Sequence, residues 1–360
     1  MKLVWRPVEL SLKETFVSHK GLKPQRLSQM AVELHWRGRS GLGWAVPAPD
    51  YGTDLDGIDA ALAACAPKLC GRTPTELERL LDDLEAICGR QTSALAAMDM
   101  ALHDLLGQMA RMPVRDLLGC APTRSGLPDT FASIGMMSPE QAREKALSLQ
   151  GWSRIKLKMG TDPDYARVRA VREVFGGLLA VDGNGAWSPQ RAPAILRALA
   201  DVGVDLVEQP IAPGDHAALK AVSAASPIPV LADEDCVGPD SILRLQGCVQ
   251  GVNIKLLKCG GLRRALKMIW LARHFGMRVM LGCKVESSIG VTAMAQLGAL
   301  ADWLDLDGHL PLADDPYTGL TIDHGRIHLP HGAGLGLTSV ATPRLFPDDN
   351  DHSIETTRIV

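Results

Sequence analysis

Short apolar runs recur along the middle of this chain about every 25 residues, and each is followed by a stretch with helical periodicity. Eight such units fit between Phe131 and Asp307, with apolar runs near residues 131, 155, 180, 207, 231, 253, 280 and 304. A parallel strand, its crossover helix and the next strand need about 25–30 residues. The pattern therefore predicts an α/β fold, a (β/α)8-type barrel whose last unit is open to modification.

An open, doubly wound sheet is the alternative arrangement for the same units. Such a sheet carries a Gly-rich phosphate-binding turn after its first strand, and the stretch Ser133-Ile134-Gly135-Met136-Met137 is not a turn of that kind. The regular β/α repetition therefore favours the barrel.

The two ends of the chain do not follow this rhythm. From Met30 to Trp36 large apolar residues occupy every second position, which indicates a half-buried strand. From Ser93 to Met109 they recur at spacings of three and four, which indicates an amphipathic helix. We therefore expect an α+β capping domain at residues 1–125, a β/α barrel catalytic domain at 126–315, and a C-terminal segment at 316–360 that packs back on the cap.

Composition restricts the classes of partner. The 360 residues are 46% hydrophobic and 22% charged, and a net charge of −3 gives no electrostatic reason to expect nucleic acid or an acidic membrane. The eight cysteines lack zinc-ligand spacing, and we find neither a signal-peptide core nor an apolar run approaching 18 residues. We expect a cytoplasmic homo-oligomer that acts on a small molecule, without a nucleic-acid or membrane partner.

Five polar residues close successive apolar runs in the middle of the barrel region: Lys158, Asp182, Glu208, Asp233 and Lys255. They are separated by 24, 26, 25 and 22 residues. The C-terminal ends of parallel barrel strands meet at one face, where these folds place their sites. Each acid by itself could simply cap the helix that follows. Three acids converging on one pocket would repel one another unless an ion neutralised them, so the spacing favours a site.

The chemistry of this set follows from its ligand types. Three carboxylates without histidine suit Mg²⁺, one ion per subunit, for which Mn²⁺ can substitute. Beside a divalent cation the pKa of a lysine falls toward neutrality, so Lys158 and Lys255 can act as general bases from opposite sides. Lys156 can hold a substrate carboxylate or damp the pKa of Lys158, whereas we expect Lys258 to pack on the following helix. Asn184 and Glu234 follow two of the acids and are expected to support the metal ligands.

At these residues the chain resembles the enolase superfamily, and within it the muconate-lactonizing subgroup. The resemblance covers nearly the whole chain and implies a capped barrel, Mg²⁺ and an enediolate intermediate. The motifs that carry it are Lys156-Leu157-Lys158, Asp182-Gly183-Asn184, Glu208-Gln209-Pro210, Asp233-Glu234, and Asn253-Ile254-Lys255 followed by Gly260-Gly261.

The last strand resembles that of the dipeptide epimerases of the L-Ala-D/L-Glu type. Asp305 and Asp307 match their Asp-x-Asp motif, which implies binding of a dipeptide ammonium, and alternate residues of a strand face the same side. Cys283 and Ser133 also match substrate-side positions. The resemblance implies epimerisation of the α-carbon of the C-terminal residue of an L,x-dipeptide by two-base proton transfer. An o-succinylbenzoate synthase, a cycloisomerase and a non-catalytic metal- and ligand-binding barrel remain alternatives.

Two departures from the family pattern affect substrate preference. Lys284 stands where methionine is expected and Asp235 where serine is usual, both expected at the mouth of the pocket. The cap loops carry charges of both signs, and their specificity residues are expected to be Lys20, Lys23, Arg26 and Asp50, with Lys284 on the barrel side. The side-chain preference for the second residue stays open.

Overall fold

The computed structural model describes residues 1–14, 17–18, 21–22, 24–123, 126–160, 164–340, 346 and 358–359. Its largest sheet has eight parallel strands in the order β13-β12-β11-β10-β9-β8-β7-β6, and a parallel bridge between Thr130 and Leu304 joins the two edges. This confirms the barrel predicted from the spacing of the apolar runs. The strands are β6 (Ala132–Ile134), β7 (Arg154–Lys158), β8 (Leu178–Asp182), β9 (Leu206–Glu208), β10 (Val230–Ala232), β11 (Gly251–Ile254), β12 (Arg278–Gly282) and β13 (Trp303–Asp305).

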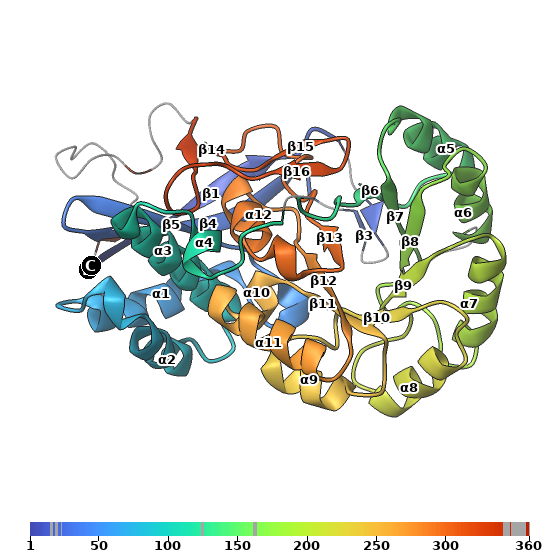
Figure 1. Ribbon diagram of the computed structural model, residues 1–360, viewed down its shortest axis with the longest axis horizontal. Coiled ribbons are helices and arrows are strands. Elements are labelled where there is room, and N and C mark those ends of the chain that lie inside the picture. Colours follow the sequence, from blue (N-terminus) through green and yellow to red (C-terminus); the bar gives the residue numbers. More distant parts are fainter. Residues whose placement is uncertain are drawn as a thin grey trace.

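Helices surround this barrel, as the right-hand side of Figure 1 shows for α5 to α8. Capping boxes explain helix starts such as that of α5, where the Ser138 side chain accepts from Gln141 N at 3.2 Å and proline occupies the first turn. The helices are α5 (Pro139–Ser148), α6 (Asp164–Arg172), α7 (Ala192–Asp201), α8 (His216–Ala224), α9 (Pro239–Leu245), α10 (Leu256–Cys259), α11 (Leu262–His274) and α12 (Ser288–Ala295).

The eighth unit of the barrel differs from the others. In the part of the chain that the structure describes, β13 is followed by short strands rather than by a helix. These are β14 (Tyr317–Thr318), β15 (Thr321–Asp323), β16 (Arg326–His328) and β17 (Thr338–Ser339). The first residues after β13 therefore lead along the barrel mouth, which brings Asp307 and Leu310 to the rim of the site.

Apolar residues fill the interior of the barrel beneath its polar strand ends. Ala180, Leu206 and Leu231 lie two residues before Asp182, Glu208 and Asp233, so each shares a strand face with the acid that follows. All three are buried and belong to one cluster with Phe131, Met280 and Trp303. The acids therefore project from the top layer of a packed core, where water is scarce.

An antiparallel sheet and a group of helices cover one side of the barrel. The sheet has the order β18-β1-β4-β5, and the pairing of β18 with β1 brings the end of the chain back to its beginning. Its strands are β1 (Lys2–Ser11), β4 (Arg26–Trp36), β5 (Arg39–Ala45) and β18 (Arg358–Ile359). The helical parts are η1 (Pro49–Tyr51), α1 (Leu55–Leu69), η2 (Pro74–Glu76), α2 (Leu77–Cys88), α3 (Thr92–Ala110) and α4 (Val114–Leu117), and the short pair is β2 (Val17–Ser18) with β3 (Gly21–Leu22).

Helix α3 connects this sheet to the barrel. It approaches β5 so closely that a Cβ at Gly43 would lie 1.9 Å from the carbonyl oxygen of Ala97. The Asp99 carboxylate accepts from Leu262 N at 2.7 Å and from Arg263 N at 3.2 Å, which satisfies the N-terminus of α11. No helix in the described part of the chain combines the length and the apolarity that crossing a bilayer requires.

Candidate active site

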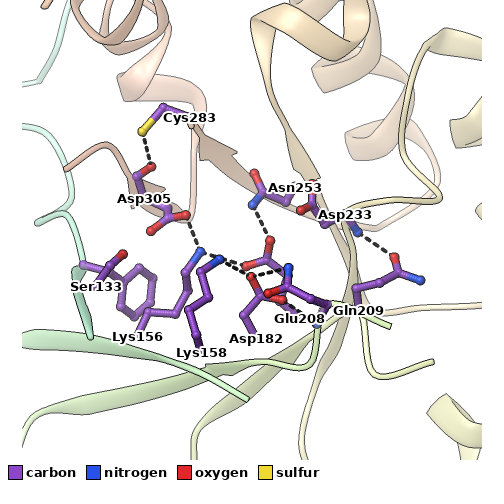
Figure 2. Close-up of polar contacts among 12 residues, drawn as sticks. Ser133, Lys156, Lys158, Asp182, Glu208, Gln209, Asp233, Asn253, Cys283 and Asp305 are labelled. Carbon is purple, nitrogen blue, oxygen red and sulfur yellow. Dashed lines mark hydrogen bonds and ion pairs between the residues drawn. The ribbon is translucent and has the colours of Figure 1, made fainter. Parts of the chain in front are cut away.

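The polar residues at the strand ends meet at the top of the barrel, as Figure 2 shows. Asp182 and Glu208 are fully buried and neighbour each other in the register of β8 and β9. Lys158 at the end of β7 approaches Asp182, with 2.5 Å between Nζ and Oδ2. Lys255, just after β11, lies with its Nζ 2.8 Å from Asp233 Oδ2. The structure thus brings together the five residues predicted from the spacing.

Two further lysines complete the set of ion pairs. Lys156 is buried and contacts both Glu208, at 3.0 Å, and Asp305. Lys258 is also buried and contacts Asp233, and its Nζ donates to the main-chain oxygen of Asn253 at 2.9 Å. The expectation that Lys258 packs on the following helix is wrong, because the single turn α10 directs residue 258 back toward the barrel.

Amide side chains hold the acids in position. The amide of Asn253 donates to Glu208 Oε1 at 2.8 Å. Gln209 accepts from the main-chain nitrogen of Asp233 at 2.9 Å and donates to Asp235 Oδ2 at 2.8 Å. Asn184 donates to Asp182 at 3.1 Å and to Glu234 at 3.3 Å. Asn184 and Gln209 have φ values of 44° and 35°, so backbone strain is concentrated at this site.

Asp235 lies away from the mouth where the sequence had suggested it. It is buried, it accepts from Gly214 N at 2.8 Å, and it lies 3.3 Å from His216 Nε2. Its contact with Gln209 makes it a support for the loop that carries Asp233. The departure from serine therefore affects how the acids are held rather than the lining of the pocket.

The charges in this cluster influence one another strongly. Burial, together with repulsion from Asp182 and Asp233, raises the pKa of Glu208 to about 7. Burial opposes ionisation of Asp233, but Lys255 and Lys258 outweigh it and hold the pKa of that carboxyl well below its usual range. Burial likewise disfavours the charge on Lys255, but Asp233 and Glu208 keep its pKa well above the ordinary value. These opposing shifts arise because the acids and lysines lie within contact distance of one another at one buried place.

The donor set fits a divalent cation that prefers oxygen ligands. Across the described residues, no three Asp, Glu, His or Cys side chains are arranged to hold a metal ion as they stand, because the strand-end acids are engaged by lysines. The three acids nevertheless repel one another at one buried centre. The Oδ1 atoms of Asn184 and Asn253 are also buried there without a hydrogen-bond partner. A hard cation such as Mg²⁺ matches oxygen donors of this kind.

A second pair of carboxylates lies at the end of β13. Asp307 accepts from Ser133 N at 2.7 Å and from Ser133 Oγ at 3.3 Å, and the thiol of Cys283 donates to the main-chain oxygen of Asp305 at 3.2 Å. Asp305 Oδ1 is buried and has no hydrogen-bond partner. Desolvation and the neighbouring Asp305 raise the pKa of Asp307 to about 6. The pair therefore favours a cation.

A cavity of about 370 Å³ opens above these groups. Lys156, Asp182 and Glu208 are buried and do not line it. Asp50 and Lys284 meet at its mouth, 3.6 Å apart, and Lys284 Nζ lies 5.1 Å from the centre of the Tyr51 ring. The predicted residues that line it are Asp50, Ser133, Lys158, Asn184, Asp233, Glu234, Lys255, Cys283, Lys284, Asp305 and Asp307.

The remaining specificity residues are not gathered there. Arg26 is exposed at the start of β4 and does not line the cavity. Lys20 and Lys23 lie outside the described residues. Tyr51, Gln209, Asn253 and Lys258 were missed as site residues. Two of them gave a signal: Gln209 stands in the motif Glu208-Gln209-Pro210, and Asn253 precedes Lys255 by two positions and so shares its strand face.

Comparison with known proteins identifies relatives of this arrangement. Residues 17–119 match the mandelate racemase / muconate lactonizing enzyme N-terminal domain, and residues 139–341 match the enolase C-terminal domain-like family. The L-Ala-D/L-Glu epimerase of Bacteroides thetaiotaomicron is 32% identical over 94% of this chain and 88% of its own length.

Two solved structures have a similar fold. The dipeptide epimerase of Enterococcus faecalis V583, complexed with Mg and L-Leu-L-Tyr, superposes with a TM-score of 0.88 at 32% identity, covering 94% of this chain and 99% of that one. The substrate-liganded L-Ala-D/L-Glu epimerase of Bacillus subtilis gives a TM-score of 0.89 at 29% identity, covering 94% and 98% of the two chains.

Proposed function

The chain belongs to the enolase superfamily, in its mandelate racemase / muconate lactonizing branch, and on that premise we propose that it is a Mg²⁺-dependent dipeptide epimerase. The reaction inverts the α-carbon of the C-terminal residue of an L,x-dipeptide. The similar proteins named above are dipeptide epimerases, and structures of such enzymes hold Mg and dipeptides. This supports an epimerase over the cycloisomerase alternative.

The observation that carries the proposal is the placement of two lysines relative to two acids. Lys158 ends the second barrel strand and Lys255 follows the sixth, so the two lie across the barrel from each other. Asp305 and Asp307 lie at the eighth strand, between them. A dipeptide whose ammonium is held at the eighth strand places its second α-carbon between the lysines. Both lysines line the cavity and can reach that carbon from opposite faces.

The residues then have distinct roles. Asp182, Glu208 and Asp233 would hold the Mg²⁺, which when bound supplies positive charge to the substrate carboxylate and to the charge that develops upon proton removal. Lys158 takes the α-proton from one face and Lys255 returns a proton on the other, or the reverse for the opposite epimer. Burial of the surrounding acids excludes water that would compete for these protons.

The alternatives fit the site less well. Substrates of an o-succinylbenzoate synthase or a cycloisomerase lack an ammonium group, which leaves the two acids after β13 without a cation. A non-catalytic binding barrel does not need two lysines on opposite sides of one cavity. We also propose a cytoplasmic location, which the eight free thiols support, and homo-oligomeric assembly, which the half-exposed Trp270 and Leu243 support. Light scattering tests the assembly.

A dipeptide library incubated with the enzyme and Mg²⁺ in D₂O tests the proposed activity. Each substrate is expected to gain one deuteron at the α-carbon of its second residue while its epimer accumulates. Mass spectrometry measures the gain and chiral chromatography measures the epimer. A library that shows neither exchange nor epimer at any Mg²⁺ concentration refutes the proposed function.

A further inference from the structure

The position of a dipeptide in the cavity follows from the strand order, given the proposed function. Its carboxylate faces the third to fifth strands, its second α-carbon lies between the second and sixth, and its ammonium lies at the eighth. The side chain of the first residue branches from the carbon that bears the ammonium. Its surroundings are therefore the loops after the strands on either side of β13, which are β12 and β6.

The wall on the β6 side is apolar. Ile134, Met136 and Met137 line the cavity from the end of β6 and the loop that follows, and Leu310 lines it three residues after Asp307. Leu310 is 38% exposed, so part of its side chain is open to the cavity that it lines. The main-chain nitrogen of Met136 donates to the oxygen of Val17 at 2.8 Å, so the cap extends the same wall.

The charged side chains near this wall are engaged with one another or with the main chain. Lys145 lies 3.1 Å from Glu14, and Lys13 Nζ donates to the main-chain oxygen of Leu310 at 2.9 Å. The cavity continues past them to Leu149 and Trp152 near the end of α5. An apolar side chain that enters on this side can therefore be buried without breaking the contacts of these charged side chains.

The wall on the β12 side has the opposite character. Lys284 projects there, held by Asp50 at 3.6 Å and lying 5.1 Å from the centre of the Tyr51 ring. The main-chain oxygen of Lys284 packs against Gly308, where a Cβ would lie 1.9 Å from it. This wall is thus fixed next to the ammonium site, and its lysine and carboxylate are paired with each other.

We propose that the wall formed by Ile134, Met136, Met137 and Leu310 is the subsite for the first residue, and that the enzyme prefers dipeptides whose N-terminal residue is large and apolar. The preference is set at the first position because the apolar wall adjoins the ammonium site. The inference concerns which dipeptides are preferred and rests on the epimerase activity proposed above.

The test compares L-Leu-L-Ala, its order isomer L-Ala-L-Leu, L-Ala-L-Ala and L-Lys-L-Ala by deuterium exchange in D₂O. The kcat/KM for L-Leu-L-Ala is expected to exceed that for L-Ala-L-Ala by about tenfold or more, because each added methylene gains favourable apolar contact. It should also exceed those for the order isomer and for L-Lys-L-Ala. A smaller gain, or a higher value for either of those two, overturns the inference while leaving the epimerase activity established.

A matched pair of variants tests the location of the subsite. Leu310→Glu is expected to lower the ratio of L-Leu-L-Ala to L-Ala-L-Ala by about tenfold, because it places a charge on the apolar wall. Leu117→Glu makes the same change at a leucine on α4 that is 38% exposed, as Leu310 is, and should leave the ratio unchanged. An unchanged ratio in Leu310→Glu overturns the assignment to this wall. Absence of exchange with every dipeptide overturns the proposed function, and this inference with it.

Discussion

Replacing Asp307 by asparagine tests how the site recognises the substrate's N-terminus. Asparagine keeps the shape of the side chain and an oxygen that can accept from Ser133 N, now 2.7 Å from the carboxylate. The neighbouring Asp305 is less suitable for this test, because it also contacts Lys156 and its loss would disturb Glu208. Asp307→Asn therefore removes one negative charge and little else.

The size of the effect follows from the surroundings of the carboxylate. Losing one charged partner of a buried pair costs about 2–5 kcal/mol. Asp307 is only half-buried, so we expect the lower part of this range, and kcat/KM should fall roughly 30- to 300-fold. Because desolvation and Asp305 raise its pKa to about 6, the assay belongs at pH 8, where the carboxyl is ionised.

The assay compares free and N-acetylated L-Leu-L-Ala in the parent enzyme and in Asp307→Asn. Acetylation removes the ammonium, so it should be costly in the parent and at least about tenfold less costly in the variant, since fewer charges are then left unpaired. Asp323→Asn, on the exposed β15–β16 hairpin, is the control and should behave as the parent. Equal costs of acetylation in parent and variant would refute the assignment of an ammonium to Asp307.

Three further outcomes are expected. Exhaustive chelation should abolish activity and Mg²⁺ should restore it, so full activity after chelation contradicts the metal site. The variant Asp182→Asn should lower kcat by at least about a hundredfold while its circular dichroism spectrum stays unchanged. Lys158→Ala and Lys255→Ala should each keep deuterium exchange with one epimer while losing interconversion, so a variant that interconverts epimers at the parent rate shows that its lysine is not a base. Asp104 is a buried residue of α3, and burial raises its pKa to about 6, above its unfolded value of about 4. The protonated form therefore stabilises the fold, and this contribution is lost as the pH rises from about 4 to 6. Denaturant unfolding at pH 4.5 and at pH 7 measures how far the free energy of unfolding falls between these two pH values. This fall should be smaller in Asp104→Asn than in the parent, by at most about 3 kcal/mol, and an equal fall in both proteins contradicts that pKa.

The barrel and its polar strand ends could be predicted because both follow from local patterns. A strand buried on both faces requires a continuous apolar run, and the polar residue that ends it is then visible in the sequence at Asp182, Glu208 and Asp233. Lys258 could not be placed in this way. It lies in what looks like the start of an ordinary crossover helix, but Gly260 and Gly261, both with positive φ, separate the turn α10 from α11.

Contacts between distant loops were also beyond the reach of periodicity. The ion pair between Asp50 and Lys284 joins residues from the cap and from the barrel, and nothing in either segment specifies the other. The hydrogen bond from Gln209 to Asp235 depends on a φ of 35° at Gln209, which is a rare conformation for a residue with a side chain. Such contacts arise from tertiary packing.

Lys156 explains how the two ends of the substrate site are connected. Its buried ammonium lies between Glu208, which belongs to the acids at the centre of the barrel, and Asp305, which belongs to the acids at the eighth strand. The sequence had suggested that Lys156 binds the substrate carboxylate directly. Its position also lets it balance the charge of both acid groups, because each would otherwise hold an unpaired buried carboxylate. Asp305 and Asp307 therefore have different environments although they lie two residues apart. Asp305 is fixed by the lysine, whereas Ser133 provides the only polar contacts described for Asp307. Asp307 is therefore the more responsive of the two to an arriving ammonium.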